Sequence, residues 1–445
     1  MIVKGKKITV LGAARSGIAA AIMLAKKGAQ VFVSDAGDPS KLTEKLNKLA
    51  AQNIEYEAGQ HSEKIYDADM IVLSPGIAVA SDIVQSCIKK AIKVYSEIEA
   101  ASWFNNSPVI AVTGSNGKTT TTTLIGEMLR QNDKDAIVAG NIGQAFSEFV
   151  ENSAKDRWAV VELSSFQLET IDSFKPDVAV VLNFAPNHLD RYASYDDYLK
   201  AKWRITKNLN ADDLLVYNAD DQKLSDWAAN LDVKKLSFKV GTENPDGAAY
   251  HNDAIWLFSE KILDTDKIIL SGIHNYMNIM AACLAVYKTG VSYEVMRNVL
   301  QQFKGVEHRL ELVRVVNGVR YINDSKATTV ESLFYALQSY KDPIVLIAGG
   351  KDKGSDFTRL NDLIITNVKH LVLIGVAADK MEKAWHNLKP LSKAGSLQEA
   401  VLTAQKTADE NDVVLLSPAC ASFDMFSDYE DRGRQFKNIV NALEK

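Results

Sequence analysis

The chain has 445 residues, of which 47% are hydrophobic and 24% are charged, and its formal net charge is −5 at pH 7. This length predicts about three domains, and the composition is that of a globular protein with full-sized cores. The negative balance gives no overall basic field, so nucleic acid is not an expected partner. No apolar run approaches the roughly 20 residues of a membrane-spanning helix, so we expect no membrane partner.

The three cysteines, Cys87, Cys283 and Cys420, lie far apart in the sequence and form no CxxC pair. This spacing disfavours a zinc ribbon or a disulfide framework and fits a reducing compartment. Residues 1–7 lack the apolar core of a signal peptide. We therefore expect a cytoplasmic protein.

Short apolar runs predict the first α/β unit. They indicate strands at residues 8–11, 31–33 and 70–73, and a helical pattern covers residues 16–27. Strands that alternate with helices indicate a parallel sheet with helices on its faces. We expect this unit to end near residue 97.

Gly12 and Gly17 frame a turn that is similar to a dinucleotide-binding loop, and Asp35 follows about 20 residues later. Ala14 stands where that pattern has its middle glycine, which weakens the case for NAD. An ordinary turn without a ligand is the alternative. The segment Ser74-Pro75-Gly76 follows another strand of the same sheet, where ligands of open α/β sheets bind, and so favours a nucleotide of some kind.

A phosphate-binding loop opens the second unit. A predicted strand at residues 109–112 leads through Thr113 into Gly114-Ser115-Asn116-Gly117-Lys118-Thr119-Thr120, and a helix follows. Glycines let backbone N–H groups turn toward phosphate, the helix N-terminus adds positive charge, and Lys118 adds a full charge. The hydroxyl of Thr119 can ligate Mg²⁺. The loop therefore predicts ATP and magnesium binding, with a glycine turn and a solvated lysine as the alternative.

The rest of the second unit contains strand patterns at residues 158–161, 178–182 and 214–217, and helical patterns at residues 195–208 and 275–288. A third unit follows, with strands expected near Val319 and at residues 344–348, 371–374 and 413–417. Three of these strands lead into polar loops, which predicts a second substrate pocket at their carboxyl ends. We place the domains at residues 1–97, 98–306 and 307–445.

Three residues near the phosphate loop are candidates for a metal site. Glu162 ends a predicted strand, where a carboxylate can hold Mg²⁺, and a surface acid is the alternative. His188 can ligate metal or contact substrate, although a lone histidine is more often structural. Lys202 would repel Mg²⁺ unless it is neutralised or converted to an anion, for example by carbamylation with CO₂, and a solvated lysine is the alternative.

Asn275 and Asn278 are three residues apart in a predicted helix and therefore share one face. Two amides on one face can read the edge of a base. Helix capping by Asn275 and solvation of Asn278 are the alternatives.

Together these motifs resemble the Mur ligase family, in particular its D-glutamate-adding members. The resemblance rests on residues 113–119, 162–167, 188–192, 308–309, 323–328 and 417–424. It implies an α/β fold of three domains: a Rossmann-like N-terminal domain, a central P-loop ATPase-like domain and a C-terminal Rossmann-like domain. It also implies that a monomer uses ATP and two Mg²⁺ ions to add D-glutamate to UDP-N-acetylmuramoyl-L-alanine through an acyl phosphate, in cytoplasmic peptidoglycan precursor synthesis.

The same resemblance implies roles for individual residues. The UDP-sugar positions are Arg15, Ser16, Asp35, Ser74, Pro75, Gly76, Asn141, Ser164 and His188. The ATP positions are Gly114, Ser115, Asn116, Gly117, Lys118, Thr119, Thr120, Asn275, Asn278, Arg309 and Asp324. The D-glutamate positions are Lys326, Thr328, Lys353, Ser422, Phe423 and Tyr429. The metal positions are Thr119, Glu162, His188 and carbamylated Lys202, and the catalytic residues are Lys118, His188 and Lys202.

Three other functions compete with this interpretation. A sibling ligase for another amino acid, or a folylpolyglutamate synthetase, shares the ATP chemistry. An NAD-dependent oxidoreductase would use the N-terminal loop, but it leaves the phosphate loop unexplained. A nucleotide-gated binding protein would bind the same ligands without catalysis.

Overall fold

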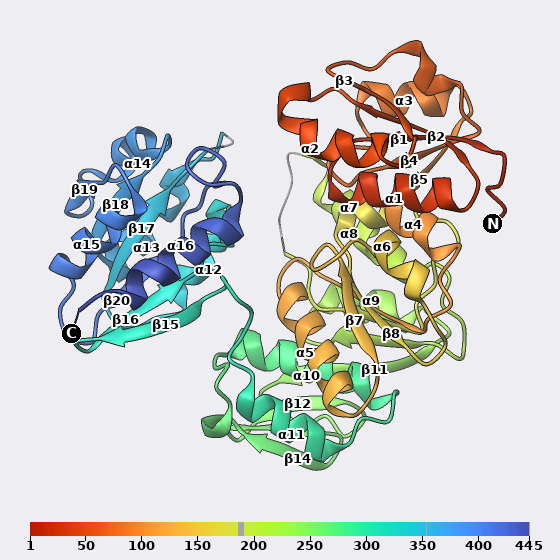
Figure 1. Cartoon of the computed structure of the whole chain (residues 1–445). Coiled ribbons are helices and arrows are strands. Elements are labelled where there is room, and N and C mark those ends of the chain that lie inside the picture. Colours follow the sequence, from red (N-terminus) through yellow and green to blue (C-terminus); the bar gives the residue numbers. More distant parts are fainter. Residues whose placement is uncertain (186–190, 353, 445) are drawn as a thin grey trace. The chain divides into compact units, whose positions relative to one another are not determined.

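The computed structural model describes residues 1–185, 191–352 and 354–444 (Figure 1). The chain divides into two compact units, Met1–Phe303 and Lys304–Lys445. The first unit contains two of the three sheets that the described residues form, and the second unit contains the third. No helix in this part of the chain is both long and apolar enough to cross a lipid bilayer.

The first sheet confirms the predicted parallel α/β arrangement. Its described strands are ordered β3-β2-β1-β4-β5 and all pair in parallel. The strands are β1 (Lys7–Leu11), β2 (Gln30–Asp35), β3 (Glu55–Ala58), β4 (Met70–Leu73) and β5 (Lys93–Ser96), and the helices are α1 (Arg15–Lys26), α2 (Pro39–Ala50), α3 (Asp82–Lys89) and α4 (Glu97–Ser102). The strand order reverses between β1 and β4, so the loops after these two strands open at the switch point where ligands bind such sheets.

The second sheet has nine strands among the described residues, in the order β14-β13-β12-β11-β10-β9-β6-β8-β7. The strands are β6 (Val109–Thr113), β7 (Ala136–Gly140), β8 (Trp158–Glu162), β9 (Val178–Val181), β10 (Leu214–Asn218), β11 (Lys234–Val240), β12 (Ala248–His251), β13 (Ala254–Leu257) and β14 (Glu260–Asp264). The pairs β12–β13 and β13–β14 are antiparallel, and sequence analysis did not predict these short strands. They extend the sheet away from β6, which lies near the other end.

Helices of this region bury long apolar faces. They are α5 (Lys118–Gln131), α6 (Phe146–Phe149), α7 (Ser165–Leu168), α8 (Tyr195–Trp203), α9 (Gln222–Ala229), α10 (Ile273–Tyr287) and α11 (Tyr293–Gln302). In α10, the residues from Asn278 to Val286 are all buried, and the helix packs along α5. The helix predicted at residues 195–208 is shorter in the structure, because a 3₁₀ turn, Arg204–Thr206, follows α8.

The third sheet, in the second unit, has the described strand order β15-β16-β20-β17-β18-β19. The strands are β15 (Glu311–Val316), β16 (Val319–Asn323), β17 (Ile344–Gly349), β18 (Val368–Ile374), β19 (Leu391–Lys393) and β20 (Val413–Leu416), and the helices are α12 (Val330–Gln338), α13 (Asn361–Asn367), α14 (Ala378–Trp385), α15 (Leu397–Thr407) and α16 (Tyr429–Asn441). Only β15 runs antiparallel to its neighbour in the described part of this sheet. Because α12 begins at Val330, the polar residues after β16 form a loop.

Glu99 joins the region of the first sheet to that of the second. This α4 side chain is fully buried, and its carboxylate accepts hydrogen bonds from the backbone N–H groups of Asp172, Ser173 and Phe174 at 2.8–2.9 Å. The indole N–H of Trp103 donates a further bond at 2.8 Å. Burial alone would raise the pKa of Glu99, but the hydrogen bonds from Ser173 and its neighbours outweigh burial and lower that pKa.

We expect Glu99→Gln to lower the free energy of unfolding by about 1–3 kcal/mol at pH 7, because an amide NH₂ would replace an acceptor among donors. Because the pKa of Glu99 is lower in the folded protein than in the unfolded chain, Glu99 stabilises the fold above the unfolded pKa of about 4.3. This stabilisation is lost as the pH falls through the folded pKa. Urea unfolding from pH 7 down to about pH 2 measures both effects. Glu44→Gln, on an exposed side chain, serves as the control. An unchanged midpoint in Glu99→Gln would refute this role.

Candidate active site

The phosphate loop joins β6 to α5 and needs glycine at two places. Gly117 is the N-cap of α5 with a φ of 83°, and a Cβ there would lie 2.0 Å from Oδ1 of Asn278. Gly114 has a φ of 150°, and a Cβ there would lie 2.9 Å from Cβ of Leu182. The backbone therefore passes too close to its neighbours for any other residue. The same contact places Asn278, on α10, directly against the loop.

Two lysines converge on one carbonyl of this loop. Nζ of Lys118 donates to the carbonyl oxygens of Gly114 at 2.9 Å and Ser115 at 3.0 Å, and Nζ of Lys202 donates to that of Gly114 at 2.8 Å. Lys202 is only 2% exposed. Burial lowers its pKa well below the usual value, and the charge of Lys118 lowers it further, against the opposing effect of Glu162. A lowered pKa favours the uncharged amine, which is the form that reacts with CO₂.

Glu162 supplies a buried carboxylate beside the loop. It ends β8, which pairs with β6, and it is 1% exposed. Its Oε1 accepts a hydrogen bond from Nδ2 of Asn141 at 2.7 Å, whereas its buried Oε2 has no hydrogen-bond partner among the described residues. A buried carboxylate oxygen without a donor suits a cation. Thr119 is also nearly buried, in the first turn of α5.

The other residues predicted around the central site form hydrogen bonds with residues close to them in the sequence. Ser164 caps α7, where its Oγ accepts from the backbone N–H of Gln167 at 3.3 Å. Nδ2 of Asn275 donates to the carbonyl of Ser271 at 2.8 Å, and Nδ2 of Asn278 donates to Oδ1 of Asn275 at 3.4 Å. The described residues contain no group of three or more His, Cys, Asp or Glu side chains placed to hold a metal. His188 lies outside the described residues.

In the first sheet, the structure brings the two predicted loops together. A Cβ on Gly12 would lie 2.9 Å from Cβ of Ser74, and the hydroxyls of Ser16 and Ser74 are 3.4 Å apart. Asp35 accepts hydrogen bonds from the N–H groups of Ala13 at 2.6 Å and Gly37 at 2.7 Å. Its carboxylate therefore shapes the glycine loop.

The other predicted residues of this edge follow β1 and β4. The backbone N–H of Ile77 donates to the carbonyl of Ser74 at 3.0 Å, which closes a turn that contains Pro75 and Gly76. Arg15, at the start of α1, is exposed. The switch point thus combines a helix N-terminus with an accessible cation, which suits an anionic ligand.

In the second unit, Asp324 is buried at the carboxyl end of β16. Its Oδ2 accepts from Oγ of Ser417 at 2.7 Å, and its Oδ1 accepts from the N–H of Leu310 at 3.2 Å. Burial raises the pKa of Asp324 to about 7, although the bond from Ser417 and the charge of Arg309 oppose this rise. Asp324 therefore connects the loop that carries Arg309 to the loop after β20.

Two residues of the predicted amino-acid pocket, Lys326 and Tyr429, lie close together. Nζ of Lys326 lies 5.7 Å from the ring centroid of Tyr429. Ser422 is buried, whereas Phe423 is 65% exposed on the same loop. Thr328 is half-buried. Lys353 lies outside the described residues.

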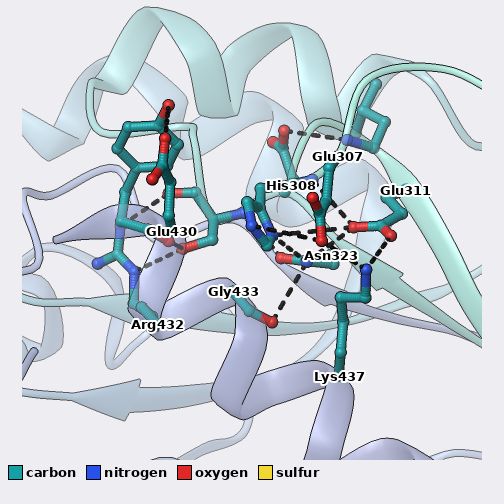
Figure 2. A network of polar contacts seen from close by, with 12 residues as sticks. Glu307, His308, Glu311, Asn323, Glu430, Arg432, Gly433 and Lys437 are labelled. Atoms are coloured by element: carbon teal, nitrogen blue, oxygen red, sulfur yellow. Dashed lines mark hydrogen bonds and ion pairs between the residues drawn. The ribbon is translucent and has the colours of Figure 1, made fainter. Parts of the chain in front are cut away.

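Arg432 organises these loops, and sequence analysis missed it. The side chain is fully buried on α16, and it donates from Nε to Oγ of Ser325 at 2.9 Å and from Nη1 to the carbonyl of Cys420 at 3.2 Å (Figure 2). Burial lowers the pKa of Arg432 to about 10. Burial also raises the pKa of the Cys420 thiol to about 12, which agrees with a packing role for that residue.

His308 lies in the same polar network as Arg432, to which Asn323 and Ser325 connect it (Figure 2). Oδ1 of Asn323 accepts from the N–H of Ser325 at 3.2 Å, so its Nδ2 faces Nδ1 of His308 at 2.9 Å. Nδ1 of His308 must then accept a hydrogen bond, which requires a neutral ring. Burial lowers the pKa of His308 and favours the same state. A Cβ on Gly433 would lie 2.2 Å from this Nδ1.

Three family models match consecutive parts of the chain. They are described as MurD N-terminal domain at residues 7–83, Mur ligase middle domain at residues 112–286, and Mur ligase, glutamate ligase domain at residues 308–420. A UDP-N-acetylmuramoylalanine–D-glutamate ligase of Chloroherpeton thalassium is 42% identical over 99% of both chains, and one of Geotalea daltonii is 43% identical over 100% of this chain and 99% of the relative. The chain belongs to the Mur ligase family.

Solved structures agree with this Mur ligase fold. The UDP-N-acetylmuramate-alanine ligase of Thermotoga maritima has a TM-score of 0.62 at 19% identity and covers 98% of this chain and 99% of its own. A MurF ligase of Thermotoga maritima, in complex with ADP, has a TM-score of 0.59 at 16% identity and covers 92% and 95%. These neighbours support the three-domain α/β fold. This Mur ligase uses ATP and acts on small molecules.

We expect Gly433→Ala to destabilise this Mur ligase by about 1–3 kcal/mol, because the new methyl group would displace the His308 ring. Gly433 lies inside α16, where alanine without a clash would stabilise the helix by roughly 0.5–1 kcal/mol. A loss of unfolding free energy would therefore indicate the clash with His308, whereas a gain would indicate that no clash occurs. Urea unfolding measures this free energy. In Gly395→Ala the new Cβ would lie 3.5 Å from its neighbour, Oε2 of Glu399, so little change is expected there. A stabilised Gly433→Ala protein would rule out the predicted clash.

Proposed function

We propose that the chain adds D-glutamate to UDP-N-acetylmuramoyl-L-alanine at the expense of ATP. The observation that carries the proposal is the phosphate loop, where Lys118 lies beside the buried Lys202 and Glu162 has an unpartnered oxygen. Relatives at 42–43% identity over almost the whole chain bear the name of that ligase. The proposed protein is a cytoplasmic monomer that needs no nucleic acid or membrane.

The proposed domains are residues 1–97 for the UDP-sugar, 98–306 for ATP and 307–445 for the incoming amino acid. The positions of the three family models, at residues 7–83, 112–286 and 308–420, support this division. The UDP-sugar would bind at the switch point of the first sheet, through Arg15, Ser16, Asp35 and the segment 74–76. Asn141, Ser164 and His188 would meet its muramoyl-alanine end.

ATP would bind the phosphate loop through the segment 114–120, with further contacts from Asn275, Asn278, Arg309 and Asp324. Thr119 and Glu162 would hold one Mg²⁺ ion, and His188 and carbamylated Lys202 a second. When bound, Mg²⁺ supplies positive charge that offsets charge on the phosphates. The orphaned oxygen of Glu162 and the lowered pKa of Lys202 fit these assignments. Carbamylation would convert the Lys202 amine into an anion that can ligate metal.

The proposed chemistry has two steps. The alanyl carboxylate first attacks the γ-phosphorus of ATP, forms an acyl phosphate and expels ADP, while Lys118 stabilises the negative charge of the transferred group. The amine of D-glutamate then attacks the acyl carbon, and the tetrahedral intermediate expels inorganic phosphate. Lys326, Thr328, Lys353, Ser422, Phe423 and Tyr429 would hold D-glutamate. The cation of Lys326, which lies near the ring of Tyr429, suits an anionic amino acid.

We expect phosphate release only when ATP, UDP-N-acetylmuramoyl-L-alanine and D-glutamate are all present. A matrix of UDP-sugar acceptors and amino acids, assayed with a coupled phosphate assay, measures this requirement. Lys118→Ala should lose at least about 100-fold in turnover, because the charge of Lys118 stabilises the transition state. Equal turnover with another amino acid would indicate a sibling ligase, and near-normal turnover in Lys118→Ala would refute the assignment of the loop.

We expect Lys202→Ala to be nearly inactive and to recover activity when short-chain carboxylic acids are added, because such an acid can replace the carbamate. The measurement is turnover against added acetate or propionate. Lys200→Ala, in which an exposed lysine of the same helix is removed, serves as the control and should need no acid. Full activity of Lys202→Ala without any acid would exclude the carbamate.

A further inference from the structure

Asn183 lies just beyond β9, beside the phosphate loop, and no role has been assigned to it so far. The side-chain amide pairs with the backbone of Asn116 in both directions: Oδ1 accepts from its N–H at 2.9 Å, and Nδ2 donates to its carbonyl oxygen at 3.2 Å. The carbonyl of Asn183 also accepts from the N–H of Ser115 at 3.0 Å. One residue therefore makes three hydrogen bonds to two consecutive loop residues.

These bonds decide which part of the loop can face phosphate. The N–H groups of Ser115 and Asn116 point at Asn183 and are not directed at a ligand. The anion-binding end of the loop is therefore the start of α5, where the helix presents its first N–H groups and the positive end of its dipole. Asn278, on α10, lies against Gly117 of the same loop. Two asparagines from different parts of the chain thus pack against the loop.

The segment that carries Asn183 is itself anchored. The N–H of Phe184 donates to Oδ2 of Asp221 at 2.9 Å, and Oδ1 of Asp221 caps α9. The N–H of Ala185 donates to Oγ of Ser115 at 2.9 Å. The rings of Phe184 and Trp227 are in edge contact, with their centroids 5.5 Å apart. Because these bonds fix the segment, Asn183 can impose its geometry on the loop.

We propose that Asn183 is a positioning residue for ATP, which fixes Ser115 and Asn116 so that the N-terminus of α5 is preorganised for phosphate. This proposal rests on the proposed function, because it takes the loop to be the ATP site. Preorganised donors strengthen binding, because the loop is not reordered when the ligand arrives. An aspartate at this position keeps the acceptor for the N–H of Asn116 but replaces the donor with a second acceptor. A leucine removes both groups and adds no charge.

The test is the dissociation constant of Mg²⁺-ADP, measured by calorimetry for wild type, Asn183→Asp and Asn183→Leu. We expect both variants to bind about tenfold more weakly, because Asn183→Leu loses two hydrogen bonds, and Asn183→Asp loses one and places a second acceptor against the carbonyl oxygen of Asn116. The KM for ATP should rise by a similar factor, while the KM for D-glutamate stays within twofold. A merely structural role would not single out the nucleotide in this way.

Asn208 offers a matched control. Its Nδ2 also donates to backbone carbonyls, those of Asp172 at 2.8 Å and Phe174 at 2.9 Å, and these lie on another loop of the same unit. Asn208→Asp and Asn208→Leu should lower the urea midpoint as the Asn183 variants do, yet bind Mg²⁺-ADP within twofold of wild type. If Asn183→Leu does not fold, Asn183→Ser retains one hydrogen-bonding group in the same space and should bind about threefold more weakly.

Unchanged Mg²⁺-ADP binding in the Asn183 variants would overturn the positioning role alone. Equal weakening in the Asn208 variants would also overturn it, because the effect would then follow from general destabilisation. A wild-type protein that binds no Mg²⁺-ADP would instead overturn the proposed function and this proposal together.

Discussion

The carbonyl oxygen of Gly114 accepts hydrogen bonds from both Lys118 and Lys202, and this arrangement is possible at low cost only if one of the two amines is uncharged. Two unit charges about 4 Å apart repel by roughly 4 kcal/mol at an effective dielectric constant of 20. Burial of Lys202 removes this conflict because it favours loss of the proton. Burial thus favours one charged and one uncharged amine at this carbonyl oxygen.

In each of the three sheet regions, a polar side chain holds loops in place through hydrogen bonds. Loops from two strands must hold a fixed relation, although their sequences are far apart and little apolar surface is available to pack them. In the first sheet Asp35 bonds the glycine loop, in the second Asn183 bonds the phosphate loop, and in the third Arg432 bonds the loops that carry Ser325 and Cys420. A polar side chain with several hydrogen bonds fixes direction as well as distance, which apolar contacts do not.

Local patterns in the sequence were enough to predict the central strands and the phosphate loop. Buried parallel strands are short apolar runs, and the order of glycine, lysine and threonine before a helix has one main physical use. The strands β12–β14 were missed because each is short and is recognisable as a strand only by its pairing with a neighbour.

Asn183, Arg432 and Glu99 were not recognised because their roles depend on contacts with distant parts of the chain. Asn183 bonds a residue 67 positions away, Arg432 one that is 107 positions away, and Glu99 one that is 75 positions away. Without the fold, each is an ordinary polar residue near a loop or on a helix. The roles predicted for His188 and Lys353 stay predictions, since both lie outside the described residues.

The buried carboxylate of Glu99 has a consequence for how the chain can be divided. In sequence, this residue lies just past the end of the first sheet, where a boundary between folding domains would be drawn at residue 97. In space, its carboxylate oxygens accept hydrogen bonds from the segment 172–174, which precedes β9 of the second sheet. A fragment that ends at residue 97 therefore leaves Glu99 with the remaining protein, together with the three backbone donors that bond to it. Any exchange of the first domain must therefore leave α4 in place with the segment 172–174.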